Sequence, residues 1–156
     1  MKSLFASILL ITSLSASAQS VDLSGAWQSG PEESRAVMIV AGKFFSVALY
    51  NMKDKTYTGT YGGTWKIEKN QFVQVQEFNT MHPDLIGVEQ RTEIKTQKDK
   101  LAFKSDKNSQ EFTRIDSGKP GELAGAWLIT GRMGEDGTIS KRTPGARKTM
   151  KRCVYK

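Results

Sequence analysis

The sequence has one cysteine, one histidine and no long apolar run, and each scarcity excludes a class of protein. Because Cys153 is alone, the chain can form no intramolecular disulfide and no zinc site built from several thiolates. His82 is the only imidazole, so a histidine-rich metal site is excluded as well. No stretch reaches the roughly 18 to 20 apolar residues that a membrane-spanning helix needs. Phosphate-binding loops and dinucleotide fingerprints are also missing, and we therefore predict no metal, no cofactor and no membrane span.

The excess of positive over negative charge lies at the carboxyl terminus. The formal net charge is +7, but residues 141–156 hold seven basic side chains and no acidic one. Residues 19–140 balance fifteen basic side chains against sixteen acidic ones. A basic tail on a neutral body gives weak, salt-sensitive attraction to anionic surfaces. We therefore predict no specific nucleic-acid partner.

The amino terminus has the composition of a secretory signal peptide. Lys2 precedes an apolar run from Leu4 to Leu14, and Ala16-Ser17-Ala18 then places small residues at the two cleavage-site positions. We predict that residues 1–18 are a signal peptide and that the mature protein is secreted or periplasmic, beginning near Gln19.

From residue 24 to residue 116 the chain is almost wholly of strand composition. Runs rich in Val, Ile, Phe, Tyr and Thr alternate with short turns such as Gly42-Lys43 and Lys69-Asn70. Short links between consecutive strands predict an up-and-down meander. The expected strands span 24–29, 35–41, 44–50, 56–61, 64–68, 71–78, 88–97, 101–105 and 110–116.

Such a meander would leave two open edges, and a domain of this size usually removes them by closing the sheet. We therefore predict an all-β fold, an up-and-down antiparallel barrel of about eight strands over residues 19–117. Eight strands leave an interior just wide enough for one small ligand. Gly62-Gly63 is interpreted as a bulge that bends a long strand around the barrel.

Alternation along two strands predicts what faces the interior. In 88–97 the inward set is expected to be Val88, Gln90, Thr92, Ile94 and Thr96. In 71–78 the register is open. Either of two sets faces inward there: Phe72, Gln74, Gln76 and Phe78, or Val73, Val75 and Glu77.

The motif Leu23-Ser24-Gly25-Ala26-Trp27 recurs one hundred residues later as Leu123-Ala124-Gly125-Ala126-Trp127. The stretch 116–121 between the two copies has the composition of a linker. Residues 118–156 are therefore interpreted as an incomplete second repeat with no stable fold of its own. An isolated hairpin is marginal in water, so we expect this segment to be disordered, to dock on the barrel, or to self-associate through an exposed strand edge.

These motifs resemble a known superfamily. Gly25-Ala26-Trp27 at the start of a meander is similar to the Gly-x-Trp signature of the lipocalin and calycin barrels. The resemblance implies that Trp27 lies across the closed end of the barrel and that Arg114, on the last strand, packs over it. More narrowly, the chain resembles a group of small secreted bacterial lipocalin-like proteins of unknown function. That likeness is carried by Gly42-Lys43-Phe44-Phe45, Gly62-Gly63-Thr64-Trp65, Glu77-Phe78 and Pro83-Asp84-Leu85-Ile86-Gly87.

Few residues are candidates for catalysis. His82 lies beside no recognisable serine or cysteine nucleophile, and a Ser/His/Asp site needs a base positioned beside its nucleophile. We therefore predict a protein that is not an enzyme, with no catalytic residues. One alternative remains, a barrel-based isomerase or hydrolase that uses an inward Glu77.

The predicted function is non-covalent binding of a small apolar or amphipathic molecule in the barrel mouth. A second alternative is a structural or interaction module whose barrel is filled by its own side chains, because a small domain needs most of its large side chains to fold. Trp27 and Arg114 are expected to be structural. The candidate ligand-binding residues are Trp65, Phe72, Gln74, Glu77, Phe78, Gln90 and Thr92.

Overall fold

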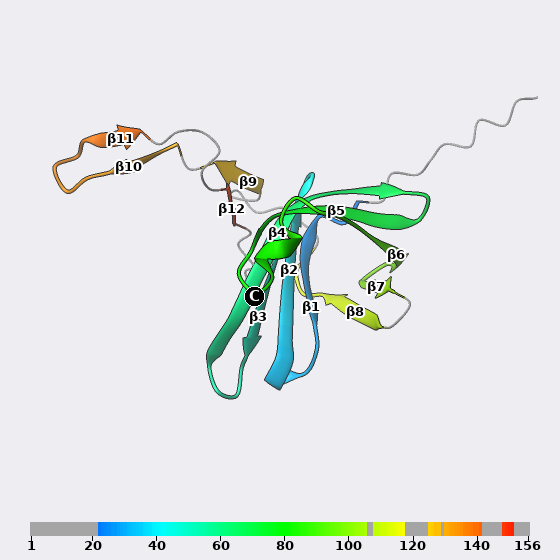
Figure 1. The fold of residues 1–156 in the computed structure, drawn as a ribbon. Helices are drawn as coiled ribbons and strands as arrows, with labels where there is room; N and C mark the ends of the chain where they lie inside the picture. The colour runs from blue at the N-terminus through cyan, green and yellow to red at the C-terminus, as the bar shows by residue number, and fades with distance from the viewer. Residues whose placement is uncertain (1–21, 106–107, 118–124, 129, 142–147, 152–156) are drawn as a thin grey trace, which may run out of the picture.

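The computed structural model describes residues 22–105, 108–117, 125–128, 130–141 and 148–151. The predicted signal peptide lies outside these residues. Eight antiparallel strands pair in chain order and close into a barrel, which confirms the predicted fold class (Figure 1). The strands are β1 (Gly25–Ser29), β2 (Arg35–Ala41), β3 (Phe44–Asn51), β4 (Thr56–Glu68), β5 (Gln71–Asn79), β6 (Glu89–Gln97), β7 (Lys100–Lys104) and β8 (Ser109–Arg114). Two 3-10 turns, η1 (Glu32–Ser34) and η2 (Pro83–Leu85), connect β1 to β2 and β5 to β6.

The two strands expected at 56–61 and 64–68 are one continuous strand, β4. Its pairing with β5 shifts at Gly62 and Gly63, since Gly62 lies opposite Phe78 and Gly63 lies opposite Gln76. Glu77 is the extra residue of this bulge. The bend brings backbones very close, because a Cβ on Gly63 would lie 2.0 Å from the carbonyl oxygen of Val75. Only glycine fits at this position, because any larger side chain would clash with the β5 backbone. The register shift confirms the predicted bulge.

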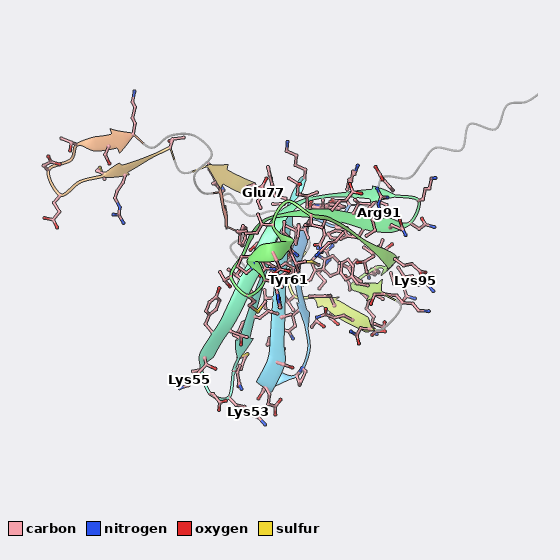
Figure 2. The ribbon with its side chains drawn as sticks, in the orientation of Figure 1. Lys53, Lys55, Tyr61, Glu77, Arg91 and Lys95 are labelled. Carbon is pink, nitrogen blue, oxygen red and sulfur yellow. The ribbon has the colours of Figure 1, made fainter. Side chains whose placement is uncertain are left out.

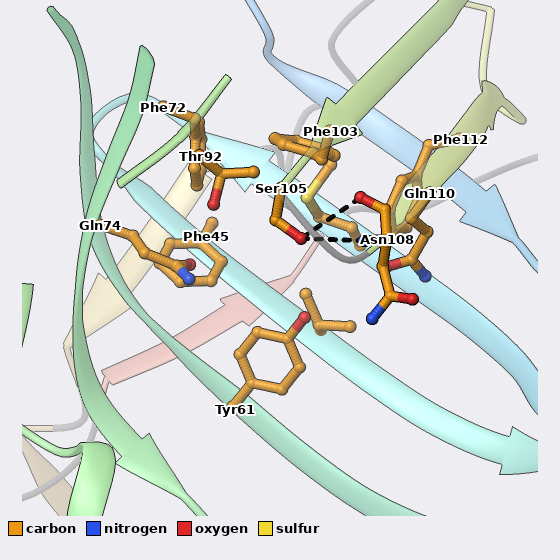
Figure 3. A pocket seen from close by; sticks show the side chains of 12 residues that line it. Phe45, Tyr61, Phe72, Gln74, Thr92, Phe103, Ser105, Asn108, Gln110 and Phe112 are labelled. Carbon is orange, nitrogen blue, oxygen red and sulfur yellow. Dashed lines mark hydrogen bonds between the residues drawn. The ribbon is translucent and has the colours of Figure 1, made fainter. Parts of the chain in front are cut away.

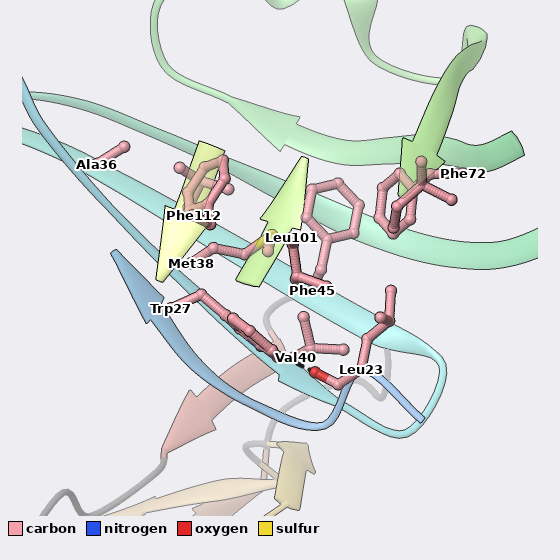
Figure 4. Close-up of a cluster of buried hydrophobic side chains, with 11 residues drawn as sticks. Leu23, Trp27, Ala36, Met38, Val40, Phe45, Phe72, Leu101 and Phe112 are labelled. Carbon is pink, nitrogen blue, oxygen red and sulfur yellow. Dashed lines mark hydrogen bonds between the residues drawn. The ribbon is translucent and has the colours of Figure 1, made fainter. Parts of the chain in front are cut away.

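One end of the barrel is closed by Trp27. The indole is 1% exposed and packs in a core with Leu23, Val40 and Leu101 (Figure 4). Its Nε1 donates a hydrogen bond of 2.9 Å to the carbonyl oxygen of Leu23. Burying the ring without leaving its N–H unpaired is what makes this large side chain stabilising.

Arg114 covers the same ring, as the resemblance implied. Its guanidinium carbon lies 4.1 Å from the centre of the Trp27 ring. The Nη1 atom donates to the carbonyl oxygen of Ser24 at 2.9 Å and to Asp116 Oδ1 at 3.1 Å. A Cβ at Gly25 would lie 2.3 Å from that Nη1, so the glycine of the motif leaves the space that the arginine occupies. Gly25, Trp27 and Arg114 therefore form one packing unit.

The carboxyl-terminal segment forms two small sheets outside the barrel. β9 (Gly125–Leu128) pairs with β12 (Lys148–Lys151), and β10 (Gly131–Met133) pairs with β11 (Ile139–Lys141). Gly125 has φ 147°, close to the 152° of Gly25. Trp127 is 50% exposed, however, where Trp27 is buried. The interpretation of this segment as an incomplete second repeat stays a prediction.

Candidate ligand-binding site

A cavity of about 190 Å³ lies inside the barrel, toward the end where β7 turns into β8 (Figure 3). Trp27 lies near Thr96 and Lys98, at the other end of β7. The cavity and the Trp27 plug therefore occupy opposite ends of the barrel. The described residues around the cavity are Met38, Phe45, Val47, Tyr61, Phe72, Gln74, Thr92, Phe103, Ser105, Asn108, Gln110 and Phe112.

Five of these side chains are aromatic and form a continuous wall. Each ring meets the next edge to face, with centres 5.2 to 6.2 Å apart, in the order Tyr61, Phe45, Phe72, Phe103 and Phe112. Aromatic pairs favour this geometry over a face-to-face sandwich. The strands bring the rings together because Phe45, Phe72 and Phe112 occupy buried, inward positions on three different strands. The wall is therefore held by the barrel itself.

Polar groups lie beside the aromatic wall. Gln74 and Thr92 line the cavity from β5 and β6, and Tyr61 enters from β4. Within the described part of the chain, no hydrogen bond reaches the Tyr61 hydroxyl. Burial raises the pKa of that hydroxyl above its ordinary value near 10.0. The site thus combines apolar surface with a few neutral groups that can form hydrogen bonds.

The structure places three of the predicted site residues around the cavity, namely Phe72, Gln74 and Thr92. Trp65 lies behind this wall, with its ring stacked on Phe72 at 5.4 Å and 14°, and its Nε1 donates to the carbonyl oxygen of Gly42. Trp65 therefore supports the wall without lining the cavity. Whether these residues bind a ligand stays a prediction.

Gln90 faces inward but lies outside the cavity lining, where its Oε1 accepts a hydrogen bond of 2.8 Å from Gln74 Nε2. The predicted inward face of β6 is confirmed at Gln90, Thr92 and Ile94. It is wrong at Val88, which precedes the strand and is 47% exposed. Thr96 lies on the inner face, opposite the buried Leu101, but is exposed at the end of the barrel.

The β5 bulge makes the prediction wrong for two site residues, Glu77 and Phe78. Phe72, Gln74 and Gln76 lie on the inner side, but the extra residue Glu77 shifts the alternation by one position. Asn79 therefore follows Gln76 into the interior, and it is 7% exposed. Phe78 is only partly buried and does not line the cavity. The prediction of Phe78 as a site residue is corrected for this reason.

Glu77 itself has an exposed side chain and does not line the cavity (Figure 2). The hypothesis of an inward Glu77 is therefore wrong in this fold. On the neighbouring strand, Arg91 and Lys95 also lie on the outer face, where Arg91 pairs with Glu68 at 3.0 Å and with Glu89 at 2.6 Å. Exposed pairs of this kind stabilise a protein only slightly.

Sequence reasoning missed several lining residues. Phe45, Phe103 and Phe112 stand at alternate inward positions of β3, β7 and β8, and their period of two was the signal that could have found them. Ser105 and Asn108 come from the β7–β8 turn, whose approach to the cavity depends on how the barrel closes. No local pattern predicts that approach.

Comparisons of this chain with models of protein families, with curated proteins and with solved structures found no significant match. Among the described residues, no group of three or more His, Cys, Asp or Glu side chains is placed to hold a metal ion. No helix in the described part of the chain is long and apolar enough to cross a membrane. Any function must therefore be inferred from the fold and from the geometry of the cavity.

The partly buried Tyr61 side chain predicts a loss of stability at alkaline pH. Its raised pKa means that the unfolded chain releases this proton first, so the free energy of unfolding falls as the pH rises above about 10. In Tyr61→Phe this contribution is absent. Urea unfolding at about pH 9 and about pH 11 should show a smaller decrease for Tyr61→Phe than for the unsubstituted protein. Tyr57→Phe, at a position that is 62% exposed on the same strand, should behave like the unsubstituted protein, and an equal decrease in all three would contradict the prediction.

Proposed function

We propose that this protein is an exported, lipocalin-like binder of a small apolar or amphipathic molecule. The observation that supports this most is the cavity of about 190 Å³ with an aromatic wall and neutral polar groups beside it. Binding sites for small molecules typically combine apolar lining with a few polar groups that set orientation. A dry apolar cavity of about 150 Å³ is large enough to hold benzene, whereas sites for drug-sized ligands occupy about 300 to 1,000 Å³. The proposed ligand is therefore small.

Kinship with lipocalin-like proteins is part of this proposal. It is supported by the closed eight-stranded meander and by Arg114 packed over Trp27 at the end away from the cavity. Export is proposed from residues 1–18 alone, and terminal sequencing of the exported protein should find a mature start near Gln19. Self-association through residues 118–156 stays a prediction.

The second candidate function is a structural module with a filled barrel. The mutual contacts of the five rings favour it, because they also describe an ordinary core. Native mass spectrometry of protein purified from its own host separates the two. A small molecule that copurifies supports the binder, while a constant apo mass together with no displacement of a fluorescent lipid probe supports the module.

A residue on the cavity wall offers a direct test. Thr92→Phe places a phenyl ring where the threonine side chain now lines the cavity, and it should weaken toluene binding at least about tenfold by occupying the ligand's volume. Isothermal titration calorimetry measures this. The control is Lys95→Phe on the outer face of the same strand, which should leave toluene binding unchanged. Equal binding by the unsubstituted protein and Thr92→Phe would count against a ligand site in this cavity.

A further inference from the structure

A chain of side-chain amides runs from the loop after β5 to the cavity. It begins at Asn79, whose Oδ1 accepts hydrogen bonds from the backbone N–H groups of Met81 at 2.9 Å and His82 at 2.8 Å. A backbone N–H can only donate, so these two bonds fix which end of the Asn79 amide is the carbonyl. Its Nδ2 is then the end that donates to Gln76 Oε1, at 2.8 Å.

The donor and acceptor ends of the next amides in this hydrogen-bonded series are assigned in the same way. Since Gln76 Oε1 accepts from Asn79, Gln76 Nε2 is the donor, and it bonds Gln90 Oε1 at 3.2 Å. Gln90 Oε1 also accepts from Gln74 Nε2 at 2.8 Å. Gln76 and Asn79 are 4% and 7% exposed, so water does not compete freely for these bonds. The orientation of each amide is therefore set by the one before it.

Gln74 is the last member of the chain and lines the cavity. Its Nε2 donates one of its two N–H groups to Gln90 Oε1, and its Oε1 takes no part in that bond. Among the described residues, no donor reaches that oxygen. Rotating the Gln74 amide by about 180° would place its Oε1 against Gln90 Oε1, and two acceptors repel each other. Gln74 therefore presents Oε1 to the cavity as an acceptor of fixed orientation. A ligand that fills the cavity would cover this oxygen, and covering an acceptor is unfavourable unless a donor meets it.

The rest of the lining restricts the ligand's charge and shape. Every described side chain around the cavity is uncharged, and moving an unpaired ion into such a site is costly. The wall of five rings favours aromatic contacts, and about 190 Å³ is close to the space that one ring fills. We propose that this cavity selects a neutral, single-ring aromatic molecule bearing a hydrogen-bond donor, as in a phenol, whose donor bonds Gln74 Oε1. This inference rests on the proposed function.

The test compares phenol with toluene, because the two differ only by a hydroxyl in place of a methyl group. Isothermal titration calorimetry should give dissociation constants between about 10 µM and 1 mM for such small ligands. Gln74→Met removes the acceptor and keeps a side chain of similar length. It should shift the ratio of phenol to toluene affinity about tenfold toward toluene, the usual effect of losing one buried hydrogen bond. Gln71→Met, on the same strand but outside the cavity lining, should leave the ratio unchanged.

A second measurement uses the unsubstituted protein, so it holds even if Gln74→Met fails to fold. Phenol should shift the side-chain amide resonances of Gln74 in an NMR titration, and toluene should shift them much less. Benzoate, with the same ring and a charge, should bind at least about tenfold more weakly than phenol.

The outcomes separate this inference from the proposed function. An unchanged phenol-to-toluene ratio in Gln74→Met, or benzoate binding as tight as phenol binding, would overturn the proposed ligand class while leaving a binding cavity. Binding of a fluorescent lipid probe with none of the three ring compounds would do the same. If the lipid probe and all three ring compounds fail to bind, the proposed function fails as well.

Discussion

Trp27→Ala should lower the free energy of unfolding by about 3 to 5 kcal/mol, the range typical of removing a large buried aromatic side chain. The indole is 1% exposed, donates to the carbonyl oxygen of Leu23 and lies under the guanidinium of Arg114. Its loss removes apolar burial, a hydrogen bond and a cation–π contact together. Chemical denaturation monitored by circular dichroism measures the change.

The chain carries its own control for this substitution. Trp127 occupies the same Gly-Ala-Trp motif but is 50% exposed, so Trp127→Ala should cost less than about 1 kcal/mol. Arg114→Ala should cost less than Trp27→Ala, and the double variant should be non-additive because the two side chains touch. A Trp27→Ala variant that melts like the unsubstituted protein would contradict the plug at this end of the barrel.

Gly63→Ala should also be severely destabilising, by about 3 kcal/mol. The added Cβ would lie 2.0 Å from the carbonyl oxygen of Val75 and 2.7 Å from the backbone nitrogen of Glu77. Both neighbours are backbone atoms of the paired strand, so no side-chain rotation relieves the clash. Thermal and urea unfolding of the variant measure the loss.

Gly42→Ala separates this steric effect from the conformational effect of glycine. Gly42 has φ 55° and nothing within 4 Å of an added Cβ, so its replacement should cost only about 1 to 2 kcal/mol through backbone conformation. If Gly63→Ala is no more destabilising than Gly42→Ala, the close approach of β4 and β5 at the bulge is wrong.

Much of the fold could be predicted because its signals are local. Alternation and turn residues located the barrel strands to within two residues at their ends, apart from the division of β4 into two. That division arose because Gly62 and Gly63 interrupt the strand composition, although the pairing continues through them. A glycine pair looks the same in a turn and in a bulge until the partner strand is known.

The site could be predicted only in part, for a related reason. Phe72 and Gln74 precede the bulge and belong to one of the two alternating sets that the sequence left open, and the structure selects that set. Phe78 follows the bulge, where one extra residue reverses the alternation. Phe45 and Phe103 reach the cavity from strands far apart in the sequence, so their meeting depends on closure of the sheet. Local patterns therefore identified the strands better than they identified which residues of different strands line the same cavity.

The most direct test of the central claim is an NMR titration of the protein with toluene, followed by backbone and indole resonances. A ligand site at the cavity end predicts shifts at Gln74, Thr92 and Asn108, which line the cavity, and none at the indole N–H of Trp27, which closes the opposite end. Saturable shifts confined to the cavity residues would support the account. No shift at these residues at millimolar toluene, or shifts centred on Trp27, would contradict it.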